Sequence, residues 1–252
     1  MLVAFIVLYL AVSVAIGLYA ATRVHNTADY AVAGRSLPLA MVVATTFATW
    51  FGSELVLGVS ARFVDGGLSE VVEDPFGASM CLVLVGLFFA YRLYQKNLIT
   101  LGDYYRQRFG TAIEIICSFI IMFSYLGWVA AQVTALGLVF NLLTQGAVSV
   151  PMGMVIGTSV VLIYTLYGGM WSVALTDFVQ MIVIAIGLLT IAWYAADMVG
   201  GAGKVIAFAA QEGKFQFFPT GGGKEWLFFF AAGITMMLGS IPQQDVFQRV
   251  LS

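Results

Sequence analysis

Long apolar segments separated by short polar stretches dominate this chain. The first, residues 2–22, contains no charged side chain before Arg23. Six further segments repeat the pattern, at approximately residues 38–61, 75–95, 112–143, 152–167, 173–196 and 226–249. A helix needs roughly 20 apolar residues to cross the hydrocarbon core of a bilayer, so each segment predicts a membrane-spanning helix. The pattern therefore predicts an all-α polytopic membrane protein, with residues 2–22 as a retained helix because they lack the basic start of a cleaved signal peptide.

Two of these segments are interrupted near their middle. Phe51-Gly52-Ser53-Glu54 breaks one, and Gly239-Ser240-Ile241-Pro242 breaks the other, with Asp245 close behind. Lipid offers no partner for free backbone N–H and C=O groups, so a spanning helix is broken only where protein or a water-filled cavity can satisfy them. Paired interruptions of this kind point to the solute site of a transporter.

Composition narrows the function further. Apolar residues make up 61% of the 252 residues, charged residues 10%, and the mean hydropathy is +0.97. The net charge of −2 gives no reason to expect binding to nucleic acid. Two isolated cysteines, Cys81 and Cys117, and one histidine, His25, suggest neither a metal site nor a haem, and we find no catalytic motif that would indicate an enzyme. No cofactor is expected.

The basic residues between the segments predict the orientation, because Lys and Arg are retained on the cytoplasmic side. With the N-terminus outside, the inner positions are Arg23, Arg35, Arg92, Lys96, Arg106, Arg108 and Arg249. The outer positions are Arg62, Lys204, Lys214 and Lys224, and the segment after Arg62 is acidic through Asp65, Glu70, Glu73 and Asp74. We expect a multi-pass protein of the plasma membrane, with a bacterial inner membrane as the favoured setting.

The chain is predicted to form one transmembrane domain over residues 1–252. The polar, glycine-rich residues 198–225 are expected to form an external loop with a short surface helix from Val205 to Gln211. A tight turn at Tyr164–Met170 is predicted to join two helices, since Gly168 and Gly169 permit the positive φ that such a turn requires.

Two motifs resemble the sodium:solute symporter family. They are YTLYGGMWSVALTDFVQ at residues 164–180 and PQQDVFQRVLS at residues 242–252. With Ala48-Thr49-Trp50, the second motif is most similar to the high-affinity choline transporter branch. The resemblance implies a LeuT-type inverted-repeat fold with helices 1 and 6 broken. Residues 2–22 would be a leading helix, 38–197 the first repeat with helices 1–5, and 226–252 helix 6, which starts the second repeat. Helices 7–10 are implied to lie outside this chain.

The resemblance also implies sodium as the coupling ion. By position, the backbone carbonyls of Ala48 and Phe51 would supply half of a sodium site. Asp177 would lie near a second cation position that some members use. Alternatively, Asp177 lies at the cytoplasmic membrane interface, because its helix has barely begun there.

Several polar and aromatic residues are candidates for solute binding. Glu54 at mid-span costs about 2.5 kcal/mol or more on insertion scales, which favours a role facing a cavity over local capping of the broken backbone. Asp245 either faces the same cavity or caps the half-helix that follows it. Trp50 and Trp128 could hold a cation on their indole faces, although a tryptophan in a membrane helix is often only packing. Further candidates are Gln132 and Gln243.

These residues predict a sodium-coupled symporter of a small organic solute, with an amine, a quaternary ammonium or a zwitterion as the candidate classes. By the resemblance, Gln243 and Ala78 stand where the choline branch has aromatic residues, so a choline cage is only half present. The alternative is a symporter-like membrane domain that senses a solute for a signalling protein. The identity of the solute, the choice between sodium and protons, and the oligomeric state are left open by the sequence.

Overall fold

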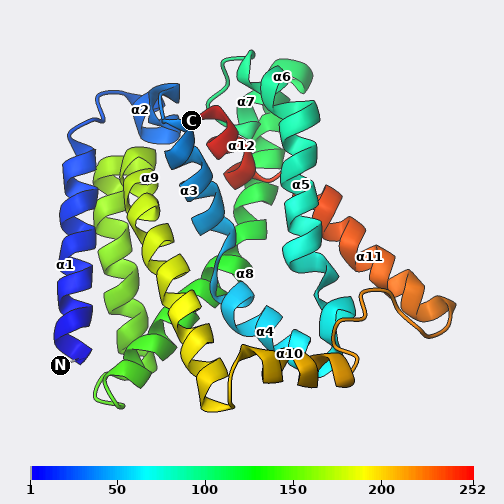
Figure 1. Cartoon of the computed structure of the whole chain (residues 1–252). Helices are drawn as coiled ribbons and strands as arrows, with labels where there is room; N and C mark the ends of the chain where they lie inside the picture. The colour runs from blue at the N-terminus through cyan, green and yellow to red at the C-terminus, as the bar shows by residue number, and fades with distance from the viewer. Residues whose placement is uncertain (1) are drawn as a thin grey trace.

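A computed structural model describes residues 2–252, and all regular structure in that range is helical (Figure 1). The first part of the chain contains α1 (Leu2–Ala21), α2 (Thr27–Val32), η1 (Ala33–Arg35), α3 (Leu39–Trp50), η2 (Glu54–Val59), α4 (Ser60–Gly66), η3 (Gly67–Val71), η4 (Val72–Gly77), α5 (Ala78–Leu84), η5 (Val85–Ala90) and α6 (Tyr91–Tyr94). The second part contains α7 (Leu101–Phe109), α8 (Thr111–Leu143), α9 (Val150–Met198), α10 (Ala202–Gln211), α11 (Gly223–Gly239) and α12 (Gln244–Leu251).

Four helical stretches among the described residues are long and apolar enough to cross a bilayer, and two bent helix pairs raise the number to as many as six. Two of the four, Glu54–Tyr94 with 41 residues and Val150–Met198 with 49, are far longer than the roughly 20 residues that one crossing needs. Each contains a residue with non-helical backbone angles, Asp74 and Gly169 respectively. Divided there, the second stretch matches the predicted segments 152–167 and 173–196, and the first matches 75–95 after Asp74. Before Asp74 the helical structure continues through α4 and η3, beyond the predicted end at residue 61.

Gly169 makes the tight turn that the glycine pair predicted. Its φ of +49° is one that a side chain disfavours, and an added Cβ would collide with the backbone carbonyl of Tyr30. Figure 1 shows the two arms of α9 running in opposite directions on either side of this turn. The chain therefore reverses within very few residues, and both arms remain helical up to the turn.

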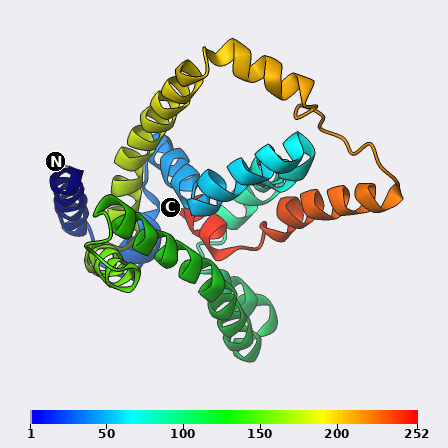
Figure 2. The same ribbon diagram turned by 90° about the horizontal axis from the view of Figure 1, so that it is seen from below.

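Helix α9 packs against α1, α3 and α8, as Figure 2 shows from below. Small residues allow these contacts to be close, as membrane helices require. A Cβ at Gly137 of α8 would lie 2.6 Å from the Val150 carbonyl of α9. Ser172 of α9 donates a hydrogen bond to the Gly17 carbonyl of α1. Other faces carry large exposed apolar side chains, such as Trp193 at 76%, as expected of a lipid-facing surface.

The basic residues are sorted between the two ends of the bundle. Figure 1 shows α2, α6, α7 and the C-terminus together at one end, which we call the basic end, and the N-terminus and α10 at the other. Arg35 of η1 donates a hydrogen bond of 2.6 Å to Asn97 between α6 and α7, and Gln244 of α12 accepts one of 2.9 Å from the Leu101 backbone of α7. Lys214 at the other end donates to the Asp65 carbonyl at 2.9 Å.

Several short helices lie outside the predicted segments, among them α2 and α7. Helix α2 precedes the first broken helix and meets α3 at 109°. Helix α7 lies in a polar segment between two predicted spans, where the hydropathy pattern predicts no helix. It starts with a capping box in which Thr100 and Asp103 each bond the other's backbone N–H. Neither helix is long enough to form a membrane-spanning segment by itself.

Candidate functional site

The first predicted break lies between α3 and η2. Helix α3 ends at Trp50, and the next helix starts at Glu54. Gln132 of α8 accepts hydrogen bonds from the Ser53 backbone N–H at 3.2 Å and from the Ser53 hydroxyl at 3.1 Å. At Gly52 a Cβ would lie 2.9 Å from the Gln132 amide, so glycine lets α8 approach the break closely. The interruption is thus stabilised by protein groups, as its position inside a membrane requires.

The second break separates α11 from α12, which meet at 44°. Asp245 lies in the first turn of α12, yet it does not cap that helix. Its carboxylate accepts a 2.5 Å hydrogen bond from the Tyr125 hydroxyl of α8, and its backbone N–H donates to the same hydroxyl at 3.2 Å. The side chain at the N-cap, Gln243, makes no capping hydrogen bond. Of the two alternatives for Asp245, the geometry favours an orientation toward the space between the broken helices.

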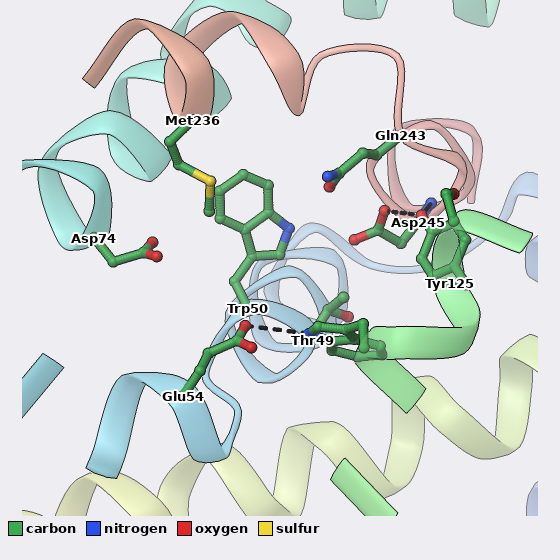
Figure 3. Close-up of a pocket in the computed structure, with 10 residues that line it drawn as sticks. Thr49, Trp50, Glu54, Asp74, Tyr125, Met236, Gln243 and Asp245 are labelled. Atoms are coloured by element: carbon green, nitrogen blue, oxygen red, sulfur yellow. Dashed lines mark hydrogen bonds between the residues drawn. The ribbon is translucent and has the colours of Figure 1, made fainter. Parts of the chain in front are cut away.

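A cavity of about 230 Å³ lies between the two breaks (Figure 3). It is lined by five of the six residues predicted to bind solute, from α3, η2, α8, the α11–α12 connection and α12: Trp50, Glu54, Trp128, Gln243 and Asp245. The sixth, Gln132, is absent from this lining, because its carbonyl oxygen is directed at Ser53. The distant segments of the sequence that carry these residues therefore converge on one site.

Glu54 and Trp128 contact each other across this cavity. The Trp128 indole N–H donates to a Glu54 carboxylate oxygen at 3.1 Å (Figure 3). Trp50 has a mixed environment, since its ring lines the cavity and also packs against the buried cluster of Cys81, Val85 and Val246. One indole thus supports a carboxylate, and the other forms part of the apolar wall.

Sequence reasoning missed several lining residues, of which Asp74 is the most informative. It was grouped with the acidic residues of an external segment, but it lies in the cavity wall. Long-range packing folds this segment back into the bundle, since Val71 and Val72 are buried and η4 packs against α11. The apolar pair Val71-Val72, separated from Asp74 by Glu73 alone, was the available signal. The other lining residues not predicted are Thr49, Ser124, Tyr125 and Met236.

The sodium candidates lie around a second, larger cavity of about 920 Å³, which borders the first break and shares Thr49 and Trp128 with the first cavity. Its lining includes Ala48, Phe51 and Asp177. The backbone N–H groups of Leu55 and Val56 both donate to the Gly52 carbonyl. Neither of them therefore donates to the Phe51 carbonyl at the break.

Asp177 is held against the first broken helix. The hydroxyl of Thr45, which is fully buried in α3, donates to the Asp177 carboxylate at 2.6 Å. Arg249 lines the same cavity and donates to the Asp245 carbonyl at 3.3 Å, while its buried Nε has no hydrogen-bond partner among the described residues. Asp177 therefore faces the protein interior next to α3.

The family model of the sodium:solute symporter family matches residues 30–252. The human high affinity choline transporter 1 is 32% identical over 261 residues, an alignment that covers 100% of this chain and 44% of the human protein. The high-affinity proline transporter PutP of Bacillus subtilis is 29% identical and covers 76% of this chain and 42% of its own length. The chain thus spans less than half the length of these relatives.

The fold is also found among solved structures. A Na⁺-coupled sialic acid symporter, described in a substrate-bound outward-open state, matches 100% of this chain and 53% of its own with a TM-score of 0.82. The sequence identity is 21%, so the match establishes the arrangement of helices and leaves the site chemistry to be argued from the residues themselves.

Proposed function

The chain belongs to the sodium:solute symporter family, and we propose that it forms the solute-binding part of a sodium-coupled transporter that works by alternating access. Its fold is the LeuT-type fold implied by residues 164–180 and 242–252. The observation that carries the proposal is the cavity between the two helix breaks, which gathers Trp50, Glu54, Trp128, Gln243 and Asp245. Solute and ion sites of such transporters form at broken helices, where backbone groups are free to bind.

The solute we propose is a small organic molecule that carries an amine or a quaternary ammonium, including zwitterions. Glu54 and Asp245 provide negative charge, and the faces of Trp50 and Trp128 provide attraction for a cation. Gln243 and Ala78 replace aromatic residues that the choline branch is expected to have, and Ala78 is buried outside the cavity lining. The lining therefore supports an amine more strongly than it supports choline itself.

Sodium is proposed to bind at the larger cavity beside the first break, to the carbonyls of Ala48 and Phe51, with Asp177 at a second cation position. The free Phe51 carbonyl and the cavity that these residues share support this placement. Sodium prefers hard oxygen ligands, which all three residues offer. The membrane potential contributes about 2.3 kcal/mol per charge per 100 mV, so one inward sodium ion is a substantial driving force.

The transporter is proposed to lie in the plasma membrane, in bacteria the inner membrane, with the N-terminus outside and the basic end in the cytoplasm. Residues 38–197 would form the first repeat, residues 198–225 an external loop, and residues 226–252 the start of the second. Contacts at the basic end then close the inner side, among them the hydrogen bond of 3.1 Å from the Leu37 N–H to the Ser252 carbonyl. Inward opening would have to separate α12 from α2 and α7.

The test is uptake into proteoliposomes by the full-length transporter that contains this chain. Radiolabelled amines, betaines, amino acids and sugars would be offered with an inward sodium gradient and, as the control, with the same sodium concentration on both sides. Accumulation above equilibrium only with the gradient supports symport and identifies the solute class. Binding of a solute without accumulation under any gradient contradicts symport and favours a solute sensor.

A further inference from the structure

The cavity between the breaks carries three carboxylates and no basic side chain. Glu54 comes from η2, Asp74 from η4 and Asp245 from α12, and none of the ten lining residues is Lys, Arg or His. The two ion pairs among residues 2–252 are Arg62–Glu73 and Arg106–Glu114, so neither neutralises a carboxylate of the cavity.

Inside the cavity only neutral groups donate to these carboxylates, while Arg249 attracts Asp245 and Arg62 attracts Asp74 from outside the lining. Neutral donors bind one oxygen each of Glu54 and Asp245, namely the Trp128 indole and the Tyr125 hydroxyl. Among the described residues, the Asp74 carboxylate accepts no side-chain hydrogen bond. Charge at membrane depth is expensive unless it meets a partner, so carboxylates from three separate elements facing one small space indicate a cationic occupant with more than one charge.

The positions of the carboxylates define how such an occupant would lie. Figure 3 shows Asp74 and Asp245 on opposite sides of the Trp50 indole, with Glu54 below it. Glu54 and Asp74 are near enough for their charges to repel each other. The indole and the Met236 thioether form an apolar middle between these two charged poles. A molecule with ammonium groups at both ends and methylenes between them matches this sequence of negative, apolar and negative surface.

We propose that the solute of this cavity is an organic dication, an α,ω-diamine whose one ammonium binds Glu54 and Asp74 and whose other binds Asp245. Asp74 is then a residue that determines specificity, by distinguishing a dication from a monocation. The inference rests on the proposed function for placing the solute here. It goes beyond that function because a transporter for a monoamine or a betaine would not need a second anionic pole.

The first experiment compares two ligands with the same four-carbon skeleton on the purified full-length protein in detergent with sodium. Putrescine carries two ammonium groups at neutral pH and n-butylamine carries one, because aliphatic amines titrate near pH 10. Isothermal titration calorimetry is expected to give putrescine an affinity at least about 10-fold higher, as one additional charge-assisted hydrogen bond predicts. Equal affinities, or tighter binding of butylamine or choline, would overturn the inference.

Variants then test the assignment to Asp74. Asp74→Asn should remove the preference, so that the affinity for putrescine falls about 10-fold toward that for butylamine, which itself changes little. Glu73→Gln is the matched control, because the neighbouring Glu73 pairs with Arg62 and does not line this cavity. It should retain the wild-type preference. The same loss in both variants, or a retained preference in Asp74→Asn, would contradict the role of Asp74.

Uptake measurements separate this inference from the proposed function. Sodium-driven accumulation of a monocation or zwitterion, without preferential binding of putrescine, would leave symport standing and refute the dication. Preferential binding of putrescine without sodium-driven accumulation of any solute would support the dication and refute symport.

Discussion

Gln132 of α8 accepts hydrogen bonds from both the backbone N–H and the hydroxyl of Ser53, at the point where the first broken helix is interrupted. These bonds link the middle of one helix to the free backbone of another, a contact that was not predicted for Gln132. The residue supports the break between the solute cavity and the proposed sodium site. It therefore acts as a positioning residue for both.

Replacing Gln132 should weaken sodium binding. Gln132→Met leaves the Ser53 N–H without its acceptor, which costs about 1–3 kcal/mol for a buried polar group, and it lets the carbonyls around the break relax. We expect a lower melting temperature and a higher sodium concentration for half-maximal uptake by the full-length transporter. Thr134→Ala on the same helix is the control, because its hydroxyl bonds only the Ala130 carbonyl of its own helix. Equal behaviour of the two variants would remove the positioning role.

Removing the carboxylate of Asp177 should likewise affect sodium more than solute. Asp177→Asn eliminates a hard anionic ligand, so half-maximal uptake should require roughly 10-fold more sodium, the loss that one charge-assisted contact predicts. Thr45→Val removes the hydroxyl that orients this carboxylate and should shift the sodium dependence in the same direction by less. Thr190→Val, whose hydroxyl bonds only the Ile186 carbonyl of its own helix, should leave it unchanged. A shift of the solute KM alone would argue against a sodium ligand.

The hydrogen bond between Trp128 and Glu54 leads to a test of the solute site. Trp128→Phe keeps an aromatic face but removes the indole N–H, so Glu54 loses a partner worth about 1 kcal/mol and the solute KM should rise about 5-fold. Trp50→Leu removes an indole face and should weaken a cationic solute by a similar amount. Trp193→Phe, a change on the exposed face of α9, is the control. Unchanged solute affinity in Trp50→Leu would eliminate Trp50 as a cation contact.

Much of this architecture is encoded locally. The apolar segments predict the spanning helices because each must satisfy its own backbone in lipid, and Phe51–Glu54 and Gly239–Pro242 predict the breaks because those residues disrupt that pattern. Asp74 escaped prediction because its placement depends on η4 packing against α11, a contact between distant segments. The hydrogen bonds of Gln132 to Ser53 were not predicted, since hydropathy locates a residue along a helix without fixing its contacts. The hydrogen bond from Thr45 to Asp177 was not predicted, because it too is a contact between distant segments.

The distribution of basic residues predicts which end of the bundle faces the cytoplasm. In a variant with Cys81→Ala and Cys117→Ser, Gln107→Cys at the basic end should react with a membrane-impermeant maleimide only after the cells are permeabilised. Gln216→Cys at the opposite end should react in intact cells. Both positions are exposed, so accessibility to water does not distinguish them. Labelling of Gln107→Cys from outside would reverse the proposed orientation.

Gly169 should be the least replaceable glycine of α9. Its φ of +49° is unfavourable for any residue with a Cβ, and an added Cβ would collide with the Tyr30 carbonyl, so Gly169→Ala must either strain the turn or push α2 away. We expect a loss of about 1–3 kcal/mol, seen as a lower melting temperature in detergent. Gly187→Ala in the second arm of the same helix adds a methyl group to open space and favours helical backbone, so it should be neutral or slightly stabilising. If both variants melt at the wild-type temperature, the reversal between the two arms does not depend on this backbone conformation, and the bundle would have to be held by side-chain packing alone.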